Sequence, residues 1–404
     1  MLRNLRRVFA ALLTLWLVWT NIAVHTAPHV GTEEELVELR AQLRYLEGAV
    51  HAGLGDEMQK LFPEGNVFTH ALYGLAWCGY AQRLSPVDTL RDHALREARW
   101  ALARIESPDA QGRFPVAAEP KFGVFYCGWR NYLLGSIVAL GPADSAETAL
   151  FARYSAELDS AFAKSRSPYI ESYAGMAWPA DNVVAMASLA LHDRSTAQYA
   201  PTIRGWLEQV RTRSDERGMM PHAWDPDRDG LREEARGSSQ ALMNVFLPII
   251  DEALANEQFV LFREQFLMER LGVPLFREYP KGQSGMGDVD SGPVILGAGF
   301  AASIVGAAAC RANDDAFHAQ ELDATIEGFG MVAGGERKRY IFGALPIADL
   351  FIAWSRSMSS AQSASPAPGF KRFHLWSVLA VVLLWAPWWI GVVRRRYVER
   401  RHAA

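Results

Sequence analysis

Cysteine is scarce in this chain. Its three cysteines, Cys78, Cys127 and Cys310, lie far apart and form no close-spaced pattern of metal ligands. This absence excludes a cysteine-based zinc centre, which needs closely spaced thiol pairs. The odd count still leaves a Cys78–Cys127 disulfide open if the domain lies outside the cytoplasm.

Basic residues are few in the central part of the chain. Ten of the 41 Lys and Arg precede Val8 or follow Phe370, so 31 lie between them, against 44 of the 45 Asp and Glu, a net charge of −13. A nucleic acid or another polyanion needs a basic surface, so an acidic domain argues against such a partner. The remaining length is sufficient to bury one large core.

Charge is absent from two long apolar runs, residues 8–24 (VFAALLTLWLVWTNIAV) and 375–393 (LWSVLAVVLLWAPWWIGVV). Each is close to the roughly 20 residues that cross a bilayer. Arginines precede the first run and follow the second, and basic flanks stay in the cytoplasm. The sequence therefore predicts a protein of a cell membrane, the bacterial inner membrane, with the lipid bilayer as its partner. Both termini are predicted to be cytoplasmic, with a periplasmic domain between the two spans.

The chain is predicted to divide into four parts. They are residues 1–30 with the first span, 31–358 as the domain, 359–372 as a Ser/Ala/Pro linker and 373–404 with the second span.

A cleaved signal peptide is the rival interpretation of the N-terminus. It would be cut after Ala27, where His25 occupies a position that favours a small residue. Trp16 and Trp19 are also bulky for a signal core. A retained first span is therefore the prediction.

Strand patterns are nearly absent, and charged amphipathic segments alternate with apolar ones. The charged segments are 33–50, 86–105, 145–164, 196–213, 253–270 and 314–329, and the apolar segments are 66–84, 127–140, 180–191, 238–250, 291–311 and 343–358. A helix that is apolar nearly all round is buried, whereas one with a charged face lies outside. The pattern predicts an all-α domain of six helical hairpins.

Six buried helices ringed by six amphipathic ones resemble the (α/α)6 toroid of the six-hairpin glycosidase superfamily, over residues 33–358. An open α-solenoid shows similar alternation and is the alternative. In a toroid the inner helices run parallel, which places Cys127, at a helix start, roughly 18 Å along the axis from Cys78. We therefore expect no disulfide between them.

The third hairpin gives a narrower resemblance. Its stretch 188–193 (SLALHD) is similar to the linalool dehydratase/isomerase family, another (α/α)6 toroid. The site of that family uses cysteines in the third hairpin, and the matching positions here are Ser172 and Asp181. Without the thiols, the resemblance implies the fold rather than the dehydratase chemistry.

Aromatic and charged residues gather in the segments that precede the apolar helices, and in a toroid these segments meet at one mouth. Aromatic faces mixed with carboxylates and arginines suit a sugar. Glycoside hydrolysis needs two carboxyl groups facing each other, and we expect Asp181 and Asp290 first, with Glu64 and Glu171 as alternates. The predicted substrate-binding residues are His70, Tyr126, Trp129, Arg130, Tyr173, Trp178, Asn182, His222, Arg236, Gln240, Tyr279 and Tyr340.

Structural roles compete with this interpretation. Asp181 and Asp290 stand just before predicted helices, where aspartate is a favoured N-cap. The arginines could pair with carboxylates, the aromatic side chains could fill the core, and the two histidines could be hydrogen-bonded structural residues. The spacing of the histidines predicts no metal site.

Asp225, Asp227 and Asp229, followed by Gly230, look like the first half of a calcium loop. The twelfth position of that loop is Arg236, where an EF-hand requires glutamate. An Asp-rich turn is the favoured interpretation, and neither calcium nor another cofactor is expected.

The leading functional hypothesis is a membrane-anchored enzyme, a hydrolase or lyase, that acts on an extracytoplasmic glycan. The second is a lyase or isomerase that acts on an apolar alcohol in a closed cleft. The third is an envelope protein that binds a glycan or a partner without catalysis. The oligomeric state stays open.

Overall fold

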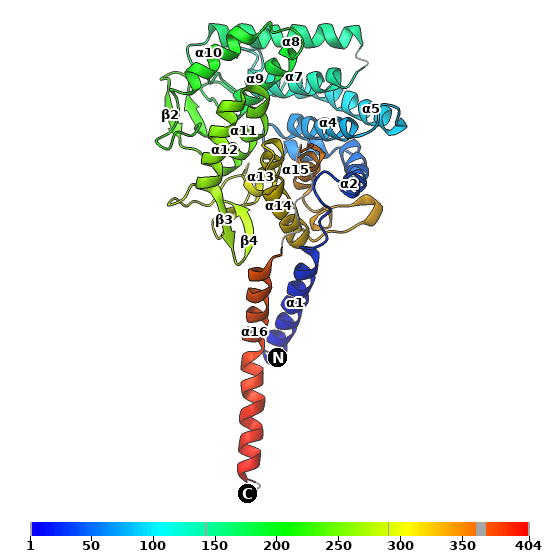
Figure 1. Ribbon diagram of the computed structural model, residues 1–404, viewed down its shortest axis with the longest axis vertical. Helices are drawn as coiled ribbons and strands as arrows, with labels where there is room; N and C mark the ends of the chain where they lie inside the picture. The colour runs from blue at the N-terminus through cyan, green and yellow to red at the C-terminus, as the bar shows by residue number, and fades with distance from the viewer. Residues whose placement is uncertain (1, 142–143, 290, 361–368, 403–404) are drawn as a thin grey trace.

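The computed structural model describes residues 2–141, 144–289, 291–360 and 369–402. Here the chain is mostly helical, with a long apolar helix at each end (Figure 1). The terminal helices are α1 (Leu2–Ala23) and α16 (Lys371–His402). The charged helices are α2 (Glu33–His51), α5 (Thr89–Ile105), α8 (Ser145–Lys164), α10 (Ala200–Val210), α12 (Glu252–Phe266) and α14 (Ala316–Phe329). The apolar helices are α4 (Gly65–Arg83), α7 (Gly123–Ala139), α9 (Pro179–Asp193), α11 (Gly237–Ile250), α13 (Phe300–Ala312) and α15 (Pro346–Ser357).

Shorter elements complete the described chain. They are the helices α3 (Leu54–Gln59) and α6 (Pro108–Gln111), the 3-10 turns η1 (Gly335–Arg337) and η2 (Ile341–Gly343), and the strands β1 (Ala223–Asp225), β2 (Gly230–Glu233), β3 (Leu267–Arg270), β4 (Val273–Phe276), β5 (Val294–Ile295) and β6 (Ala298–Gly299). The strands form three separate antiparallel pairs, β1–β2, β3–β4 and β5–β6. The prediction of a predominantly helical domain is confirmed.

Two predicted helices are wrong at one end. The helix expected at 253–270 stops at Phe266, and the helix expected at 291–311 begins only at Phe300. Both errors fall on hairpins whose two-residue turns, 271–272 and 296–297, pair a leucine at φ 53 with a glycine at φ 83. Positive φ at both turn residues suits the right-handed twist of paired strands. These Leu-Gly pairs were the overlooked signal.

The apolar helices follow one another in space as in the sequence. α4 contacts α7, α7 contacts α9, α9 contacts α11, α11 contacts α13, and α13 contacts α15, which in turn contacts α4. Each charged helix contacts at least one apolar helix. All three cysteines are buried and free, so the prediction that Cys78 and Cys127 do not pair is confirmed.

Aromatic side chains fill the space between the apolar helices. Trp129 of α7 lies 5.0 Å from Phe68 of α4, 5.7 Å from Phe246 of α11 and 6.3 Å from Trp354 of α15, measured between ring centroids. Such edge-to-face contacts add to the burial of large rings. Because Trp129 is fully buried among them, it belongs to the core rather than to a binding surface.

The two terminal helices are long and apolar enough to cross a membrane. They contact each other and leave the domain together (Figure 1). His374 Nδ1 lies 2.6 Å from Asn21 Oδ1, and Trp385 Nε1 donates to Thr14 Oγ1 at 3.1 Å. The start of α16 and the end of α1 both pack near α14. The predicted linker, residues 359–372, falls largely outside the described residues.

Candidate functional site

The loops that precede α9, α11 and α13 contact one another. The backbone N–H of Trp224, in the fourth hairpin, donates to the carbonyl of Ala177, in the third, at 2.9 Å. The N–H of Gly237, at the start of α11, donates to the carbonyl of Glu278, in the fifth, at 2.8 Å. Three of the predicted mouth segments therefore form one connected region.

The loop before α9 places aromatic rings beside carboxylates. Tyr173 and Trp178 are half-buried, with ring centroids 6.0 Å apart. Asp181 Oδ2 accepts a hydrogen bond from Ser172 Oγ at 2.5 Å, and Glu171 Oε1 accepts one from the N–H of Gly175 at 2.7 Å. The N-cap of α9 is Trp178, so the interpretation of Asp181 as the N-cap of this helix is wrong. Asp181 lies in the first turn of α9.

Arg236 is the centre of a second polar group. Its Nε donates to Glu278 Oε1 at 3.0 Å, its Nη1 to Asp288 Oδ2 at 2.5 Å and its Nη2 to Ser291 Oγ at 2.9 Å. The ring of Tyr279 lies 5.5 Å from the guanidinium carbon. Arg236 thus holds the loop of the fifth hairpin against the start of α11.

The pKa values of the two carboxylates of this group are shifted in opposite directions. Burial raises the pKa of Glu278 to about 6, although Ser238 and Arg236 both stabilise its charge. Asp288 is nearly half exposed, and hydrogen bonds from Arg236 and Ser291 outweigh its burial and lower its pKa to about 2. A buried acid that can hold a proton beside an ionised one is an arrangement that suits acid–base chemistry.

His222 joins the same group. Its Nδ1 contacts Ser239 Oγ, and its Nε2 lies 3.5 Å from Arg236 Nη1. Because a guanidinium only donates, Nε2 acts as the acceptor and the ring proton lies on Nδ1, directed at Ser239. Burial and then Arg236 lower the pKa of His222 to about 4, so the ring is neutral near pH 7. In this tautomer the histidine does not activate Ser239 as a nucleophile.

Eight predicted substrate-binding residues are buried: His70, Tyr126, Trp129, Arg130, Asn182, Arg236, Gln240 and Tyr340. His70 Nδ1 donates to the carbonyl of Asn66 at 2.7 Å, and burial lowers its pKa to about 4. The guanidinium of Arg130 lies 3.4 Å from the ring centroid of Tyr154. These side chains are buried and have structural partners, and their roles in substrate binding stay predictions.

Three further predicted groups have different outcomes. Asp290 lies outside the described residues, and the helix it was expected to cap begins only at Phe300. Glu64 precedes α4 without a capping hydrogen bond from its side chain. Asp225 accepts from the N–H groups of Asp227 and Arg228, while Asp229 pairs with Arg213 at 2.7 Å. Asp225 thus forms a turn and Asp229 an ion pair within the suspected calcium loop.

No protein-family model matches the chain, and no curated protein matches it significantly. The geometry of the loops is therefore the basis for a functional proposal. Glu278, Asp288 and Ser291 were not predicted as site residues. Their signal was the high density of charged and small residues in the segment 277–291.

Proposed function

We propose that the six hairpins form an (α/α)6 toroid. The contact of α15 with α4 makes the first and last hairpins neighbours. In an open α-solenoid each repeat contacts only its neighbours in the sequence. The contact between the ends of the series therefore favours a closed ring.

Both terminal helices cross a membrane in this proposal, and the domain lies on the periplasmic side of a bacterial inner membrane. The clusters of arginine at residues 3–7 and 394–401 support cytoplasmic termini. The pairing of α1 with α16 supports two spans that leave the domain together. Two neighbouring tethers would restrict rotation of the domain above the bilayer.

The toroid mouth acts on a glycan of the cell envelope. The observation that carries this proposal is the loop before α9, where the rings of Tyr173 and Trp178 lie 6.0 Å apart in the segment that also carries Glu171 and Asp181. Aromatic rings can stack on the C–H faces of a sugar, while carboxylates bind its hydroxyls and exchange protons. Asp181 is the proposed first acid. Asp290 remains its proposed partner from the sequence.

Replacing Asp181 by asparagine tests this role. We expect Asp181→Asn to slow the release of reducing sugar from a purified envelope glycan at least about tenfold, because an amide can neither donate nor accept the catalytic proton. The measurement uses the full chain in detergent, with Asp290→Asn alongside. Asp227→Asn, in the exposed turn between β1 and β2, is the matched control and should retain the wild-type rate.

Wild-type rates in both Asp181→Asn and Asp290→Asn would disprove the catalytic assignment. Glycan binding without any release of sugar by the wild type would instead support the non-catalytic binding protein.

A second candidate function is binding of an amphipathic ligand from the membrane, such as a lipid-like alcohol. A pocket of about 660 Å³ lies where α1 meets α2 and the segment before η1. Its apolar lining includes Trp19, Ile22 and Val37, and three acidic and three basic residues also line it: Glu38, Glu327, Glu336, Arg40, Arg44 and Lys338. Apolar walls with a few charged groups suit a ligand with a long apolar tail and a polar head.

Filling this pocket should abolish that binding. We expect Ala41→Trp, on the pocket wall formed by α2, to weaken binding of a fluorescent long-chain prenol at least about tenfold, because the new ring occupies the space of the tail. Ala103→Trp, on the exposed face of α5, adds the same ring elsewhere and should bind like the wild type. Equal binding by all three proteins would reject the pocket as the site.

A further inference from the structure

Two charged helices carry matching pairs of potential metal ligands. Glu47 and His51 lie four residues apart on α2, and His93 and Glu97 lie four residues apart on α5. Residues at this spacing occupy the same face of a helix, one turn from each other. Each helix therefore presents one carboxylate and one imidazole on one side.

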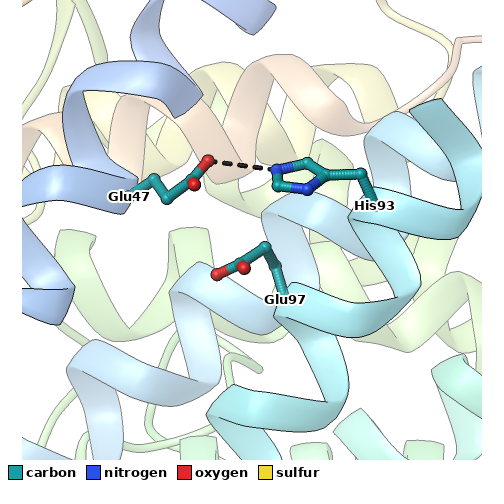
Figure 2. Close-up of side chains that lie close together, drawn as sticks. All are labelled: Glu47, His93 and Glu97. Atoms are coloured by element: carbon teal, nitrogen blue, oxygen red, sulfur yellow. Dashed lines mark hydrogen bonds and ion pairs between the residues drawn. The ribbon is translucent and has the colours of Figure 1, made fainter.

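The two faces meet between the first and second hairpins. Glu47 Oε2 lies 3.1 Å from His93 Nε2, and His51 Nε2 lies 2.8 Å from Glu97 Oε2. Figure 2 shows Glu47 of α2 directed toward His93 and Glu97 of α5. One ligand atom from each of these three residues lies within 4.8 Å of the other two. An ion about 2.1 Å from each ligand requires only a small inward movement from this spacing.

We infer that Glu47, His93 and Glu97 bind a divalent transition-metal ion of the Zn²⁺ type. One imidazole nitrogen with two carboxylates suits Zn²⁺ or Co²⁺, whereas Ca²⁺ and Mg²⁺ select oxygen ligands. Two half-buried carboxylates this close also repel each other, and a divalent cation offsets that repulsion. His51 Nε2 lies 2.8 Å from Glu97 Oε2 and holds this carboxylate from the side.

The surroundings of the three residues resemble an outer shell of a metal site. The hydroxyl of Tyr73, buried in α4, donates to Glu97 Oε2 at 2.6 Å. The ring of His51 stacks on Trp100, 3.9 Å between centroids, and the ring of His93 packs edge-on against Trp77 at 5.1 Å. Such partners fix the direction of ligands before an ion arrives.

An open side of the cluster gives the ion an entry path. A pocket of about 610 Å³ is lined by Glu47, His51 and Glu97 together with Arg44, Glu336 and Arg337. Coordination positions left by the protein would face this pocket and take water or an anion. The bound ion would join the first hairpin to the second from outside, at a place independent of the mouth.

Metal titration of the full chain in detergent tests the inference. After treatment with a chelator, the wild type should bind one Zn²⁺ per chain in calorimetry, and Co²⁺ in its place should show ligand-field absorption. His93→Ala should weaken Zn²⁺ binding more than about hundredfold, since it removes a ligand, and Tyr73→Phe about tenfold, since it removes an outer partner. His318→Ala is the matched control, because His318 also contacts a carboxylate, Asp315, on another charged helix. It should bind Zn²⁺ like the wild type.

Ordinary ion pairs between the histidines and glutamates predict a different result. The wild type would then bind Zn²⁺ no more tightly than His93→Ala, and this outcome would overturn the inference. An equal loss in His318→Ala would also overturn it. If His93→Ala does not fold, Glu97→Gln preserves the side-chain shape and should still lose the Co²⁺ spectrum of the wild type.

Discussion

Replacing Arg311 by alanine is expected to destabilise the folded domain by about 3–5 kcal/mol, because the change leaves buried carboxylates without their cation. Arg311 of α13 is buried, and its Nη2 donates to Glu35 Oε1 at 2.6 Å and also pairs with Asp323. Glu35 and Asp323 are buried as well, so water cannot replace the guanidinium. Among substitutions of single buried residues, this is the largest loss of stability that we expect.

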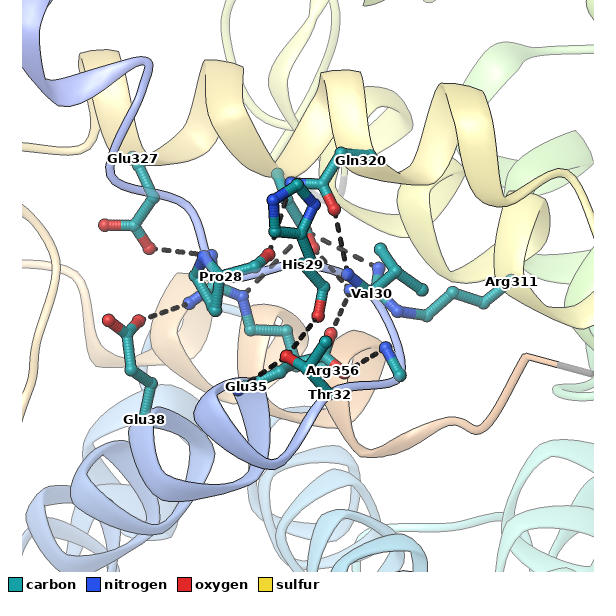
Figure 3. A network of polar contacts seen from close by, with 12 residues as sticks. Pro28, His29, Val30, Thr32, Glu35, Glu38, Arg311, Gln320, Glu327 and Arg356 are labelled. Carbon is teal, nitrogen blue, oxygen red and sulfur yellow. Dashed lines mark hydrogen bonds and ion pairs between the residues drawn. The ribbon is translucent and has the colours of Figure 1, made fainter. Parts of the chain in front are cut away.

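The ion pairs of Arg311 belong to a network that joins the first hairpin to the fifth and sixth (Figure 3). Glu35 of α2 also accepts from Arg83 of α4 at 2.8 Å. Arg356 of α15 donates to Glu327 of α14 at 2.7 Å. The segment after α1 is held to the same place, since the N–H of Val30 donates to Gln320 at 2.8 Å and Gln320 donates to the carbonyl of Pro28 at 3.2 Å. Loss of Arg311 should therefore weaken the contact of the first hairpin with the fifth and sixth hairpins.

Denaturant unfolding in detergent, followed by tryptophan fluorescence, measures this loss. Arg263→Ala is the matched control: Arg263 pairs with Asp315 at 2.9 Å, but its side chain is 43% exposed. Such pairs contribute less than about 1 kcal/mol. Equal effects of the two substitutions would contradict the assignment, and Arg311→Met together with Glu35→Gln and Asp323→Asn should recover part of the stability by removing the cation and both carboxylates.

The sequence predicted the helices well because their signal is local. Alternation of charged and apolar segments follows from which helices face water, and α8 has the predicted bounds, residues 145–164. The short strands were missed because their turns lie within apolar runs that also fit a helix. The turn at 271–272 depends on two residues with positive φ, which periodicity does not report.

The site was less predictable because burial depends on tertiary packing. Trp129 and Tyr173 both looked like mouth residues, yet Trp129 is fully buried and Tyr173 is only half-buried. The metal-binding cluster was missed for a related reason. Its residues lie on two hairpins, and only the packing of α2 beside α5 brings Glu47 to His93. Each Glu/His pair with a spacing of four was visible in the sequence, but their meeting was not.

Asp349 gives the second large expected effect, which is a loss of stability as the pH rises. This buried residue of α15 accepts from the N–H of Tyr340 at 2.9 Å and from Gln42 Nε2 at 3.4 Å. Its Oδ2 has no hydrogen-bond partner among the described residues. Burial therefore raises the pKa of Asp349 from 3.8 to about 7. A neutral carboxyl is the form that this place in the fold favours.

The raised pKa means that the folded chain holds a proton that the unfolded chain releases between pH 3.8 and about pH 7. The contribution of Asp349 is complete below pH 3.8 and is lost as the pH rises through about 7. A shift of this size corresponds to about 4 kcal/mol. Asp349→Asn, which stays neutral, should lack this loss, and its stability should exceed that of the wild type most clearly at pH 8.

Unfolding free energies measured from pH 4 to pH 8 test this expectation. Asp92→Asn, on the exposed face of α5, is the control and should follow the wild-type profile. An unchanged profile in Asp349→Asn would contradict the assignment.

Glu35 and Glu327 behave in the opposite way, because arginine and lysine partners outweigh burial and hold their pKa values below the ordinary 4.5. Their stabilisation is complete above pH 4.5 and is lost as the pH falls through their lowered values. The contact between the first and last hairpins thus loses stability toward acidic pH through Glu35 and Glu327. It loses stability toward alkaline pH through Asp349. Contact between the first and last hairpins should therefore be most stable near pH 4.5 and should weaken as the pH rises from there to about 7, and Asp349→Asn should remove this loss on the alkaline side.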